Sequence, residues 1–283
     1  MGWGGWSSTT YNTTVRSMGF TSTSAMASAN VQEVYRENFL NPLLNPKNVM
    51  RECCDTEEHP NTIPVIIALD VTGSMGHAAT TCASKLNDIM TELYDKVEDV
   101  EFLMMGIGDL SYDAAPIQAS QFESDIRILD QATKIYFESG GGGNSYESYT
   151  AAWYFGLHNT RLDCWKRGKK GIIITMGDEP LNPYLPGYQL SQVLGCPAQD
   201  VDTEELYKQV LEKYDVYHIA ITNESSYIHY ANRIKATWGK LLGQHLVIAS
   251  SDDLSKVISN IVMDHENQTK NFSVNVTEEG IGW

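Results

Sequence analysis

The chain has 283 residues and a formal net charge of −16 at pH 7, from 20 Lys and Arg against 36 Asp and Glu. Hydrophobic residues at 42% and aromatic residues at 10% are typical of a globular protein, and the length suits one large α/β domain or two small domains. Because no basic face is available to displace counterions from a phosphate backbone, we exclude nucleic acid as the expected partner.

Targeting signals and cysteine patterns narrow the class of protein further. No apolar run reaches the roughly 18 residues needed to cross a bilayer, and the first residues, Met1 to Trp6, lack the basic and apolar regions of a signal peptide. The five cysteines form no CxxC pair, which gives neither a disulfide framework nor a zinc-ligand spacing. The sequence therefore predicts a soluble, cytoplasmic protein with reduced thiols and no membrane insertion.

Two segments precede the first strong pattern. Residues 1–28 contain twelve Ser or Thr and no sustained periodicity, which predicts a flexible or partner-ordered arm. Residues 29–61 hold a short amphipathic stretch from Val31 to Leu40 and then a Pro-rich turn segment. We expect this second segment to be a lead-in that packs on the main domain.

The main domain begins where short apolar runs start to alternate with helical patterns. Val65 to Asp70 is a continuous apolar run that ends in a carboxylate, which is typical of a strand buried on both faces. Val100 to Ile107 predicts a second strand, and the alternation over Pro116 to Phe122 predicts a short edge strand. The helix between the first two strands has apolar residues at spacings of three and four, namely Ala83, Leu86, Met90, Leu93 and Val97.

The same alternation continues to the end of the domain. The predicted elements are, in chain order, a helix over 126–134, a strand from 135, a helix over 147–158, a strand over 171–175, a helix over 204–214, a strand over 216–221, a helix over 225–238, a strand over 246–249 and a helix over 254–262. Strands that alternate with helices indicate a mostly parallel sheet covered on both faces. We therefore predict one α/β domain over residues 62–265, followed by a tail over 266–283.

Ligands of such sheets bind at the carboxyl ends of the strands, so the residues directly after each apolar run are informative. Three of these loops are rich in oxygen ligands: Asp-Val-Thr-Gly-Ser-Met-Gly at 70–76, Ser-Gly-Gly-Gly-Gly-Asn-Ser-Tyr-Glu at 139–147, and Thr-Met-Gly-Asp-Glu-Pro at 175–180. Any one of them alone would be an ordinary turn or helix cap. Their order on the strands of one sheet favours a shared site.

The side chains of these loops predict a hard divalent cation. Hydroxyl and carboxylate oxygens suit Mg²⁺, Mn²⁺ or Ca²⁺, and no Cys/His cluster favours zinc. The i, i+2, i+4 spacing lets a tight turn bring Asp70, Thr72 and Ser74 into one small space. Gly73 and Gly76 allow the chain to turn sharply there.

The sequence Asp70-x-Thr72-x-Ser74, the glycine loop and Asp178 together resemble the metal-ion-dependent adhesion site of von Willebrand factor type A domains. The run from Leu69 to Met75 is similar to the bacterial version of that motif, and the resemblance covers about residues 62–265. It implies a Rossmann-like, mostly parallel sheet with helices on both faces and one antiparallel edge strand, in agreement with the alternation after Pro116.

The resemblance also implies roles for individual residues. Thr72 and Ser74 would supply hydroxyls to the metal, whereas Asp70 and Asp178 would act through bound waters and by fixing the hydroxyls. The family's usual Thr after the glycines is missing, and we expect one of three nearby residues in its place: first Ser145, then Asn144 and last Glu147. The family's Thr-Asp-Gly reads Thr-Met-Gly-Asp over 175–178, so its Asp is displaced.

Such a site favours binding over catalysis. If the direct ligands are mostly neutral hydroxyls, the cation remains under-compensated, and an Asp or Glu carboxylate from a protein partner completes its coordination. The resemblance implies a shift of the helix over 254–262 that couples cation occupancy to affinity. We therefore predict a non-enzymatic, metal-dependent protein-binding module, an intracellular scaffold or assembly factor, with Mg²⁺ first and Mn²⁺ or Ca²⁺ as alternatives. Tyr184 and Tyr188 are the candidates for the partner-binding face.

One enzyme class uses similar residues. Asp70-Val-Thr-Gly-Ser74 also resembles the phosphorylation loop of haloacid-dehalogenase-type phosphotransferases, with Gly177-Asp178 as the later metal motif and Asp70 as nucleophile beside Mg²⁺. Against this alternative, the Lys that such enzymes require has candidates only in Lys169 and Lys170, at a strand start. The glycine run has no place in that scheme either.

Overall fold

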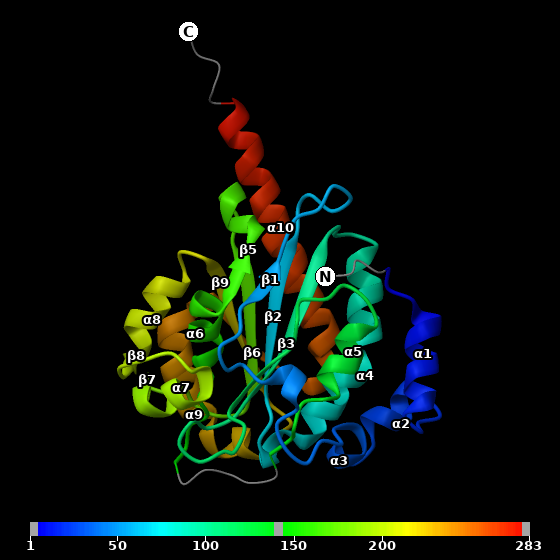
Figure 1. Cartoon of the computed structure of the whole chain (residues 1–283), viewed down its shortest axis with the longest axis vertical. Helices are drawn as coiled ribbons and strands as arrows, with labels where there is room; N and C mark the ends of the chain where they lie inside the picture. Colours follow the sequence, from blue (N-terminus) through cyan, green and yellow to red (C-terminus); the bar gives the residue numbers. More distant parts are fainter. Residues whose placement is uncertain (1–4, 139–143, 279–283) are drawn as a thin grey trace.

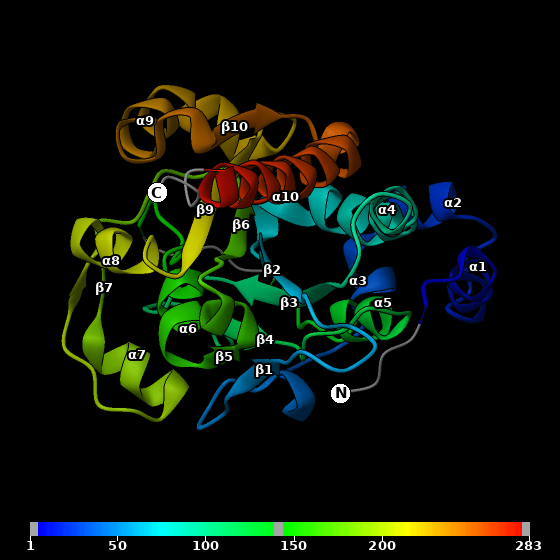
Figure 2. The ribbon, with the colours of Figure 1, turned by 90° about the horizontal axis from the view of Figure 1, so that it is seen from above.

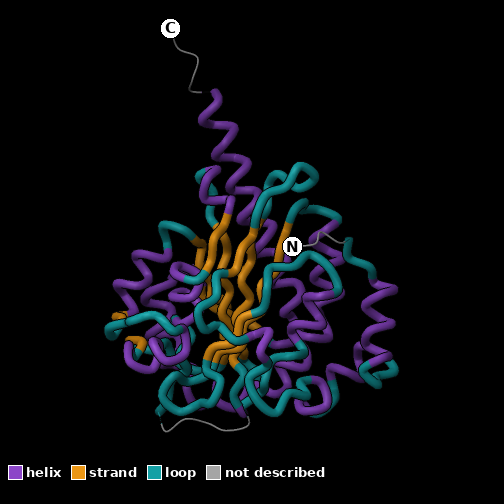
Figure 3. The backbone as a smooth tube through the Cα atoms, in the orientation of Figure 1, coloured by secondary structure: helices purple, strands orange, loops and turns teal. Residues whose placement is uncertain are grey.

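The computed structural model describes residues 5–138 and 144–278 of the chain. Its centre is a six-stranded sheet in the order β10-β9-β6-β2-β3-β4, which lies between layers of helices (Figures 1 and 3). The strands are β2 (Ile63–Asp70), β3 (Val100–Ile107), β4 (Ile117–Ala119), β6 (Gly171–Gly177), β9 (Tyr214–Ile221) and β10 (Leu246–Ala249). All neighbours pair in parallel except β3 and β4, which are antiparallel. The predicted α/β fold with one antiparallel edge strand is confirmed.

Alternate residues of the buried strands supply two separate cores, one on each face of the sheet. Val65 and Ile67 of β2 face a core that includes residues of α4 (Gly76–Tyr94), α5 (Arg127–Ala132) and α10 (Leu254–Glu278). Ile66 and Ala68 face the other core, with residues of α6 (Ala151–His158), α7 (Gly187–Leu194), α8 (Thr203–Val210) and α9 (Ser225–Leu242). Figure 2 shows α6 and α8 on the opposite side of the sheet from α4. Because both faces of β2 are covered by a core, the strand has apolar residues at successive positions and not only at alternate ones.

The Ser/Thr-rich segment predicted as a flexible arm is instead folded in its described part. It forms α1 (Ser8–Ser17) and α2 (Thr23–Ala27), which lie beside α4 (Figure 1). The hydroxyls of Ser7 and Ser22 cap these helices by accepting backbone N–H groups. Tyr11 is fully buried and donates its hydroxyl to the Ala83 carbonyl at 2.8 Å. Two of the hydroxyls that suggested disorder are thus helix caps, and a few apolar side chains anchor the segment.

The predicted lead-in packs on the domain and contains little regular structure. The amphipathic stretch forms only α3 (Val31–Val34), and the Pro-rich segment after it forms the 3-10 turn η1 (Pro42–Leu44). After them, β1 (Arg51–Cys53) pairs in parallel with β5 (Thr160–Leu162) in a separate small sheet. The buried Arg51 guanidinium donates to the Ala119 carbonyl of β4 at 2.8 Å, so the lead-in is tied to the sheet edge.

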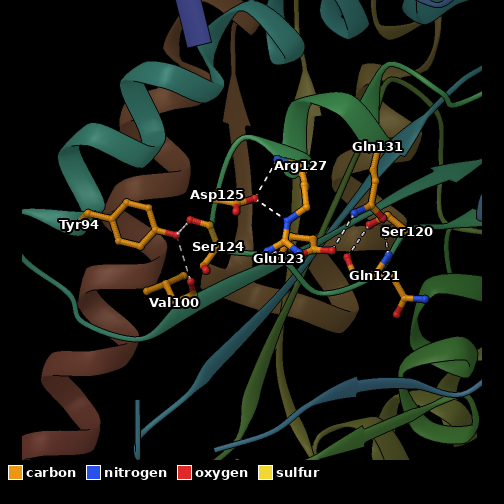
Figure 4. Close-up of polar contacts among 9 residues, drawn as sticks. All are labelled: Tyr94, Val100, Ser120, Gln121, Glu123, Ser124, Asp125, Arg127 and Gln131. Atoms are coloured by element: carbon orange, nitrogen blue, oxygen red, sulfur yellow. Dashed lines mark hydrogen bonds and ion pairs between the residues drawn. The ribbon is translucent and has the colours of Figure 1, made fainter. Parts of the chain in front are cut away.

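A polar network holds the antiparallel edge strand in place (Figure 4). Beyond β4, the Gln121 amide donates to Gln131 Oε1 at 2.7 Å, and the Arg127 guanidinium lies 2.8 Å from both Glu123 and Asp125. The Tyr94 hydroxyl of α4 donates to the Ser124 carbonyl. These contacts clamp the segment between β4 and α5 against α4, which shields the edge of the sheet.

Several predicted boundaries differ from the structure. No strand begins at Ile135, and the helix expected from Glu147 starts four residues later, at Ala151. The tail predicted from residue 266 is instead the continuation of α10 to Glu278. The sequence patterns also missed α7 and the antiparallel pair β7 (Tyr184–Leu185) and β8 (Val201–Asp202), because these elements are short and lack a clear period. No helix among the described residues is both long and apolar enough to span a bilayer.

Candidate cation site at the carboxyl edge of the sheet

Asp70 is the last residue of the central strand β2 and is fully buried. Its Oδ1 accepts the Thr72 amide at 2.9 Å and the Thr72 hydroxyl at 2.6 Å. Its Oδ2 accepts the hydroxyl of Tyr149 at 2.6 Å. Both oxygens are therefore fixed by donors from the protein, and the carboxylate holds the Thr72 side chain in one orientation.

Asp178, one residue beyond the end of β6, holds the second hydroxyl of the predicted site. The Ser74 hydroxyl, in the 3-10 turn η2 (Gly73–Met75), donates to Asp178 Oδ1 at 3.0 Å. The backbone amide of Ser226, in the first turn of α9, donates to Oδ2 at 3.0 Å. Since β2 and β6 are adjacent, the structure brings together four of the five predicted site residues: Asp70, Thr72, Ser74 and Asp178.

In the described part of the chain, the remaining predicted ligand, Ser145 or one of its alternatives Asn144 and Glu147, does not pair with another predicted site residue as the first four do. The Ser145 hydroxyl accepts the Tyr230 hydroxyl of α9 at 3.2 Å, and the Asn144 amide nitrogen donates to Asp109 at 2.6 Å. Glu147 is buried, and its Oε2 has no hydrogen-bond partner among the described residues. Burial, and then the charge of Asp70, raises the pKa of Glu147. Glu147, the candidate placed last by sequence, is thus the one with a buried carboxylate close enough to interact electrostatically with Asp70. Residues 139–143 of the glycine loop lie outside the described residues.

Acidic side chains accumulate at this edge and raise one another's pKa values. Burial, and then the charge of Asp178, raises the pKa of Asp70 to about 7. Burial, followed by Asp70 and other carboxylates, raises the pKa of Glu147 to about 11 and that of Glu179 to about 8. Burial also raises the pKa of Glu224 to about 7, with smaller effects from Asp178 and Asp70. A bound cation would relieve this mutual repulsion and the cost of burial.

The donor atoms fit a hard cation. The hydroxyls of Thr72 and Ser74 keep lone pairs for a metal while they donate to Asp70 and Asp178. One buried carboxylate oxygen each of Glu147, Glu179 and Glu224 lacks a hydrogen-bond partner within the part of the chain that the structure describes. Within the described residues, no three His, Cys, Asp or Glu side chains form a ready-made metal centre. The hydroxyls would therefore have to complete the coordination.

A small pocket borders the acidic edge. Its volume is about 250 Å³, and Asp109, Asn144, Tyr146, Glu147 and Tyr184 are among its lining residues. Tyr184, predicted to face a partner, is half exposed at this pocket, whereas Tyr188 is 74% exposed on α7 and does not line it. The structure thus separates the two tyrosines: one borders the candidate site and the other lies on the neighbouring surface.

The loop between β9 and α9, which leads to the Ser226 amide bonded to Asp178, is connected to the start of α10. Asn223 lies between β9 and α9, three residues before Ser226. Its side chain accepts the Ser251 amide at 2.9 Å and donates to the Ser251 hydroxyl at 2.9 Å. Because Ser251 opens the 3-10 turn η5 (Ser251–Asp253) directly before α10, one set of hydrogen bonds joins the site to the last helix.

The geometry offers little to a phosphotransferase. Both oxygens of Asp70 accept hydrogen bonds within the protein, from Thr72 and Tyr149. The Lys170 ammonium lies 3.4 Å from Asp215 Oδ1, at the amino ends of β6 and β9. Lys169 is its neighbour in the chain, so both lysines lie at the opposite edge of the sheet from Asp70.

Sequence reasoning missed three residues of the site. Glu179 directly follows Asp178 and Glu224 precedes α9, and both have buried oxygens near the two aspartates. The acidic pair Asp178-Glu179 gave a signal for the first, whereas Glu224 has no neighbour in sequence that identifies it. Tyr149 falls within the helix predicted over 147–158, whereas in the structure it lies two residues before α6 and donates its hydroxyl to Asp70.

Comparisons with known proteins add little to this geometry. No family profile and no curated protein matches the chain. In structure, the chain is similar to the pilus adhesin SpaC from Lactobacillus rhamnosus GG in its open conformation, with a TM-score of 0.49 and 12% identity over 80% of this chain and 31% of the adhesin. A second form of the same adhesin has a TM-score of 0.46 and 12% identity over 77% of this chain and 32% of the adhesin. The chain thus spans less than one third of the adhesin's length.

Proposed function

We propose that this protein is a divalent-cation-dependent protein-binding module of the von Willebrand factor A type, with Mg²⁺ as the expected cation and Mn²⁺ or Ca²⁺ as alternatives. The observation that carries the proposal is the pairing of two hydroxyls with two buried carboxylates on adjacent strands: Thr72 with Asp70, and Ser74 with Asp178. The partner is a protein that supplies an Asp or Glu carboxylate. We place the module in the cytoplasm, as a scaffold or assembly factor.

The pairing favours binding because each carboxylate is used to orient a hydroxyl. A hydroxyl that donates its proton to a carboxylate points its lone pairs away from it, toward the space where a cation would lie. The carboxylates then stabilise the cation from behind the hydroxyls. One coordination position toward solvent remains for a ligand from outside the chain, which is where a partner carboxylate fits.

The surface around the edge supports a protein partner. Exposed apolar or aromatic side chains follow the loops of the site: Tyr112 after β3, Tyr184 after β6 and Ile228 at the start of α9. Ile228 is 77% exposed although it lies only two residues from Ser226, which contacts Asp178. Large apolar side chains exposed beside a polar site are typical of interaction surfaces.

Thermal unfolding with added cations tests the proposal. The wild-type protein and Asp70→Asn are melted in EDTA and with Mg²⁺, Mn²⁺ or Ca²⁺. A cation present at 100 times its Kd stabilises the folded state by about 2.7 kcal/mol, so we expect a higher Tm for the wild type and none of this gain for the variant. Asp215→Asn, at the opposite edge of the same sheet, is the matched control and should keep the full gain.

Two results would contradict the proposal. If no cation raises the Tm of the wild type, the carboxyl edge holds no metal and the loops are only turns and caps. If the metal binds but EDTA leaves the affinity for a captured partner unchanged, the site is structural. Turnover of p-nitrophenyl phosphate that is lost in Asp70→Asn would instead support the phosphotransferase.

A further inference from the structure

The hydroxyl of Tyr149 is the third donor to Asp70, and it comes from outside the loops of the candidate site. Tyr149 lies two residues before α6 and is fully buried. Its O–H···Oδ2 distance of 2.6 Å is as short as that of the Thr72 hydroxyl on the other oxygen. Short hydrogen bonds of a hydroxyl to a carboxylate are among the strong ones. Asp70 is therefore held from both sides.

The backbone makes space for this hydroxyl. Gly177 is the last residue of β6 and pairs with Ala220 of β9. A Cβ atom at Gly177 would lie 2.2 Å from the Tyr149 hydroxyl oxygen and 2.4 Å from its Cε1. Any side chain at this position would displace the ring, so Gly177 allows the phenol to reach Asp70 at the end of the neighbouring strand.

An aromatic cluster fixes the ring itself. The Tyr149 ring meets His218 edge-on at 5.3 Å and Trp238 edge-on at 5.7 Å, and these two rings stack on each other at 3.7 Å. The Thr175 hydroxyl hydrogen-bonds His218 Nδ1 at 2.9 Å, and Trp238 Nε1 donates to the Glu179 carbonyl at 3.1 Å. The cluster is thus bonded to Asp70 through Tyr149, and to the loop that contains Asp178 and Glu179 through Trp238.

We propose that Tyr149 is a positioning residue of the cation site, acting through Asp70 and touching no metal itself. This inference rests on the proposed function. The phenol fixes the plane of the Asp70 carboxylate, and that plane decides where Oδ1 holds the Thr72 hydroxyl. Without the phenol, Oδ2 loses its donor, the carboxylate rotates, and the hydroxyl is no longer aimed at the cation.

Tyr149→Phe removes the hydroxyl and leaves the ring in its aromatic cluster. Cation affinity is measured by calorimetric titration of the folded protein with MgCl₂ or MnCl₂. We expect the Kd of the variant to rise at least about tenfold, the lower bound for lost groups that orient metal ligands. Circular dichroism at the same temperature verifies that the variant is folded.

Tyr214→Phe is the matched control. Tyr214 is equally buried, and its hydroxyl bonds Thr160 at 2.7 Å and donates to the Gly156 carbonyl at 3.1 Å, near the amino edge. Its loss should lower the Tm, as the loss of the Tyr149 hydroxyl does, but leave the cation Kd unchanged. This comparison separates a positioning role from a general loss of stability.

Equal cation affinity in Tyr149→Phe and in the wild type would overturn this inference while the proposed function stands. Equal weakening in both tyrosine variants would overturn it as well, because the effect would then be a general one. A wild type that binds no cation would defeat the proposed function, and the positioning role with it. Gly177→Ala, if folded, should weaken binding as Tyr149→Phe does, since its methyl group displaces the same hydroxyl.

Discussion

Asp215 and Asp70, at opposite ends of the central sheet, have opposite pKa shifts. At the amino edge, Asp55 pairs with Arg167, and Asp215 lies 2.9 Å from His265 Nδ1 and 3.4 Å from the Lys170 ammonium. Burial alone would raise the pKa of Asp215, yet the hydrogen bond and charge of His265, together with Lys170, leave it below its usual value. At the carboxyl edge, burial raises the pKa values of Asp70, Asp178 and Glu179.

The difference shows what distinguishes a structural acid from a site that lacks its counter-charge. Partly buried carboxylates are stable where a cationic side chain lies against them, as at Asp55 and Asp215. At the carboxyl edge, hydroxyls and other carboxylates surround Asp70 and Asp178 instead. Arg167, His265 and Lys170 supply the counter-charges of Asp55 and Asp215. We infer that the counter-charge of Asp70 and Asp178 is a cation from solution.

The pH dependence of stability should show the largest effect. In EDTA, the free energy of unfolding should fall by on the order of 3 kcal/mol between about pH 5 and about pH 8. The pKa values of Asp70 and Glu179 are about 7 and about 8 in the folded state, above their unfolded values, so the folded protein loses stability as they ionise. Asp215, with a lowered pKa, acts in the other direction and loses its contribution only as the pH falls below about 4.

Urea unfolding at several pH values measures this slope. A saturating divalent cation should flatten it, because the bound ion keeps the acids ionised at little cost. A flat profile in EDTA would show that these carboxylates are already neutralised within the chain, and the contrast between the two edges would then be lost.

Arg167→Met tests the amino edge. The Arg167 guanidinium pairs with Asp55 and donates to the Thr62 carbonyl at 2.7 Å. Its removal leaves both acceptors short of a donor, so we expect a loss of about 2 kcal/mol in urea unfolding. The Tm gain from a cation should be unchanged. A reduced gain would mean that the two edges are coupled and do not act independently.

Tyr184→Ala should have the smallest effect on stability and a selective effect on binding. The Tyr184 side chain is 50% exposed at the pocket beside Glu147, so truncation should change the free energy of unfolding by less than about 0.5 kcal/mol. Partner capture in the presence of cation should weaken, whereas Tyr188→Ala, which does not touch the pocket, should weaken it less. Equal effects would assign the partner to the wider surface of α7.

The parts of the fold that the sequence predicted are those with long, regular patterns. The buried strands and α4 were found because a strand covered on both faces must be apolar throughout, and because a long helix repeats its apolar face. The order of the loops then placed Asp70 and Asp178 at one edge of the sheet. The α1–α2 segment was misjudged because its helices depend on capping hydroxyls and on Tyr11, which bonds α4 across the fold.

The details of the site depended on side chains that sequence spacing does not connect. Nothing in the sequence joins Tyr149 to Asp70, since the contact requires a loop before α6 and a glycine on β6. The choice among Ser145, Asn144 and Glu147 likewise depends on burial, which composition does not give. The sequence motifs predicted which strands carry the site residues. Only the packing showed which neighbouring atoms orient the side chains of those residues.

The last helix, α10, is long and begins close to a residue that is hydrogen-bonded to a loop of the candidate site. The 25 residues of α10, at a rise of 1.5 Å each, span about 38 Å, and Figure 1 shows the helix running beyond the rest of the fold. Its first turn follows Ser251, which is bonded to the loop before α9. A tilt of about 5° at Leu254 would move the far end by about 3 Å. A movement of that loop that tilted the helix would therefore be largest at the helix's far end.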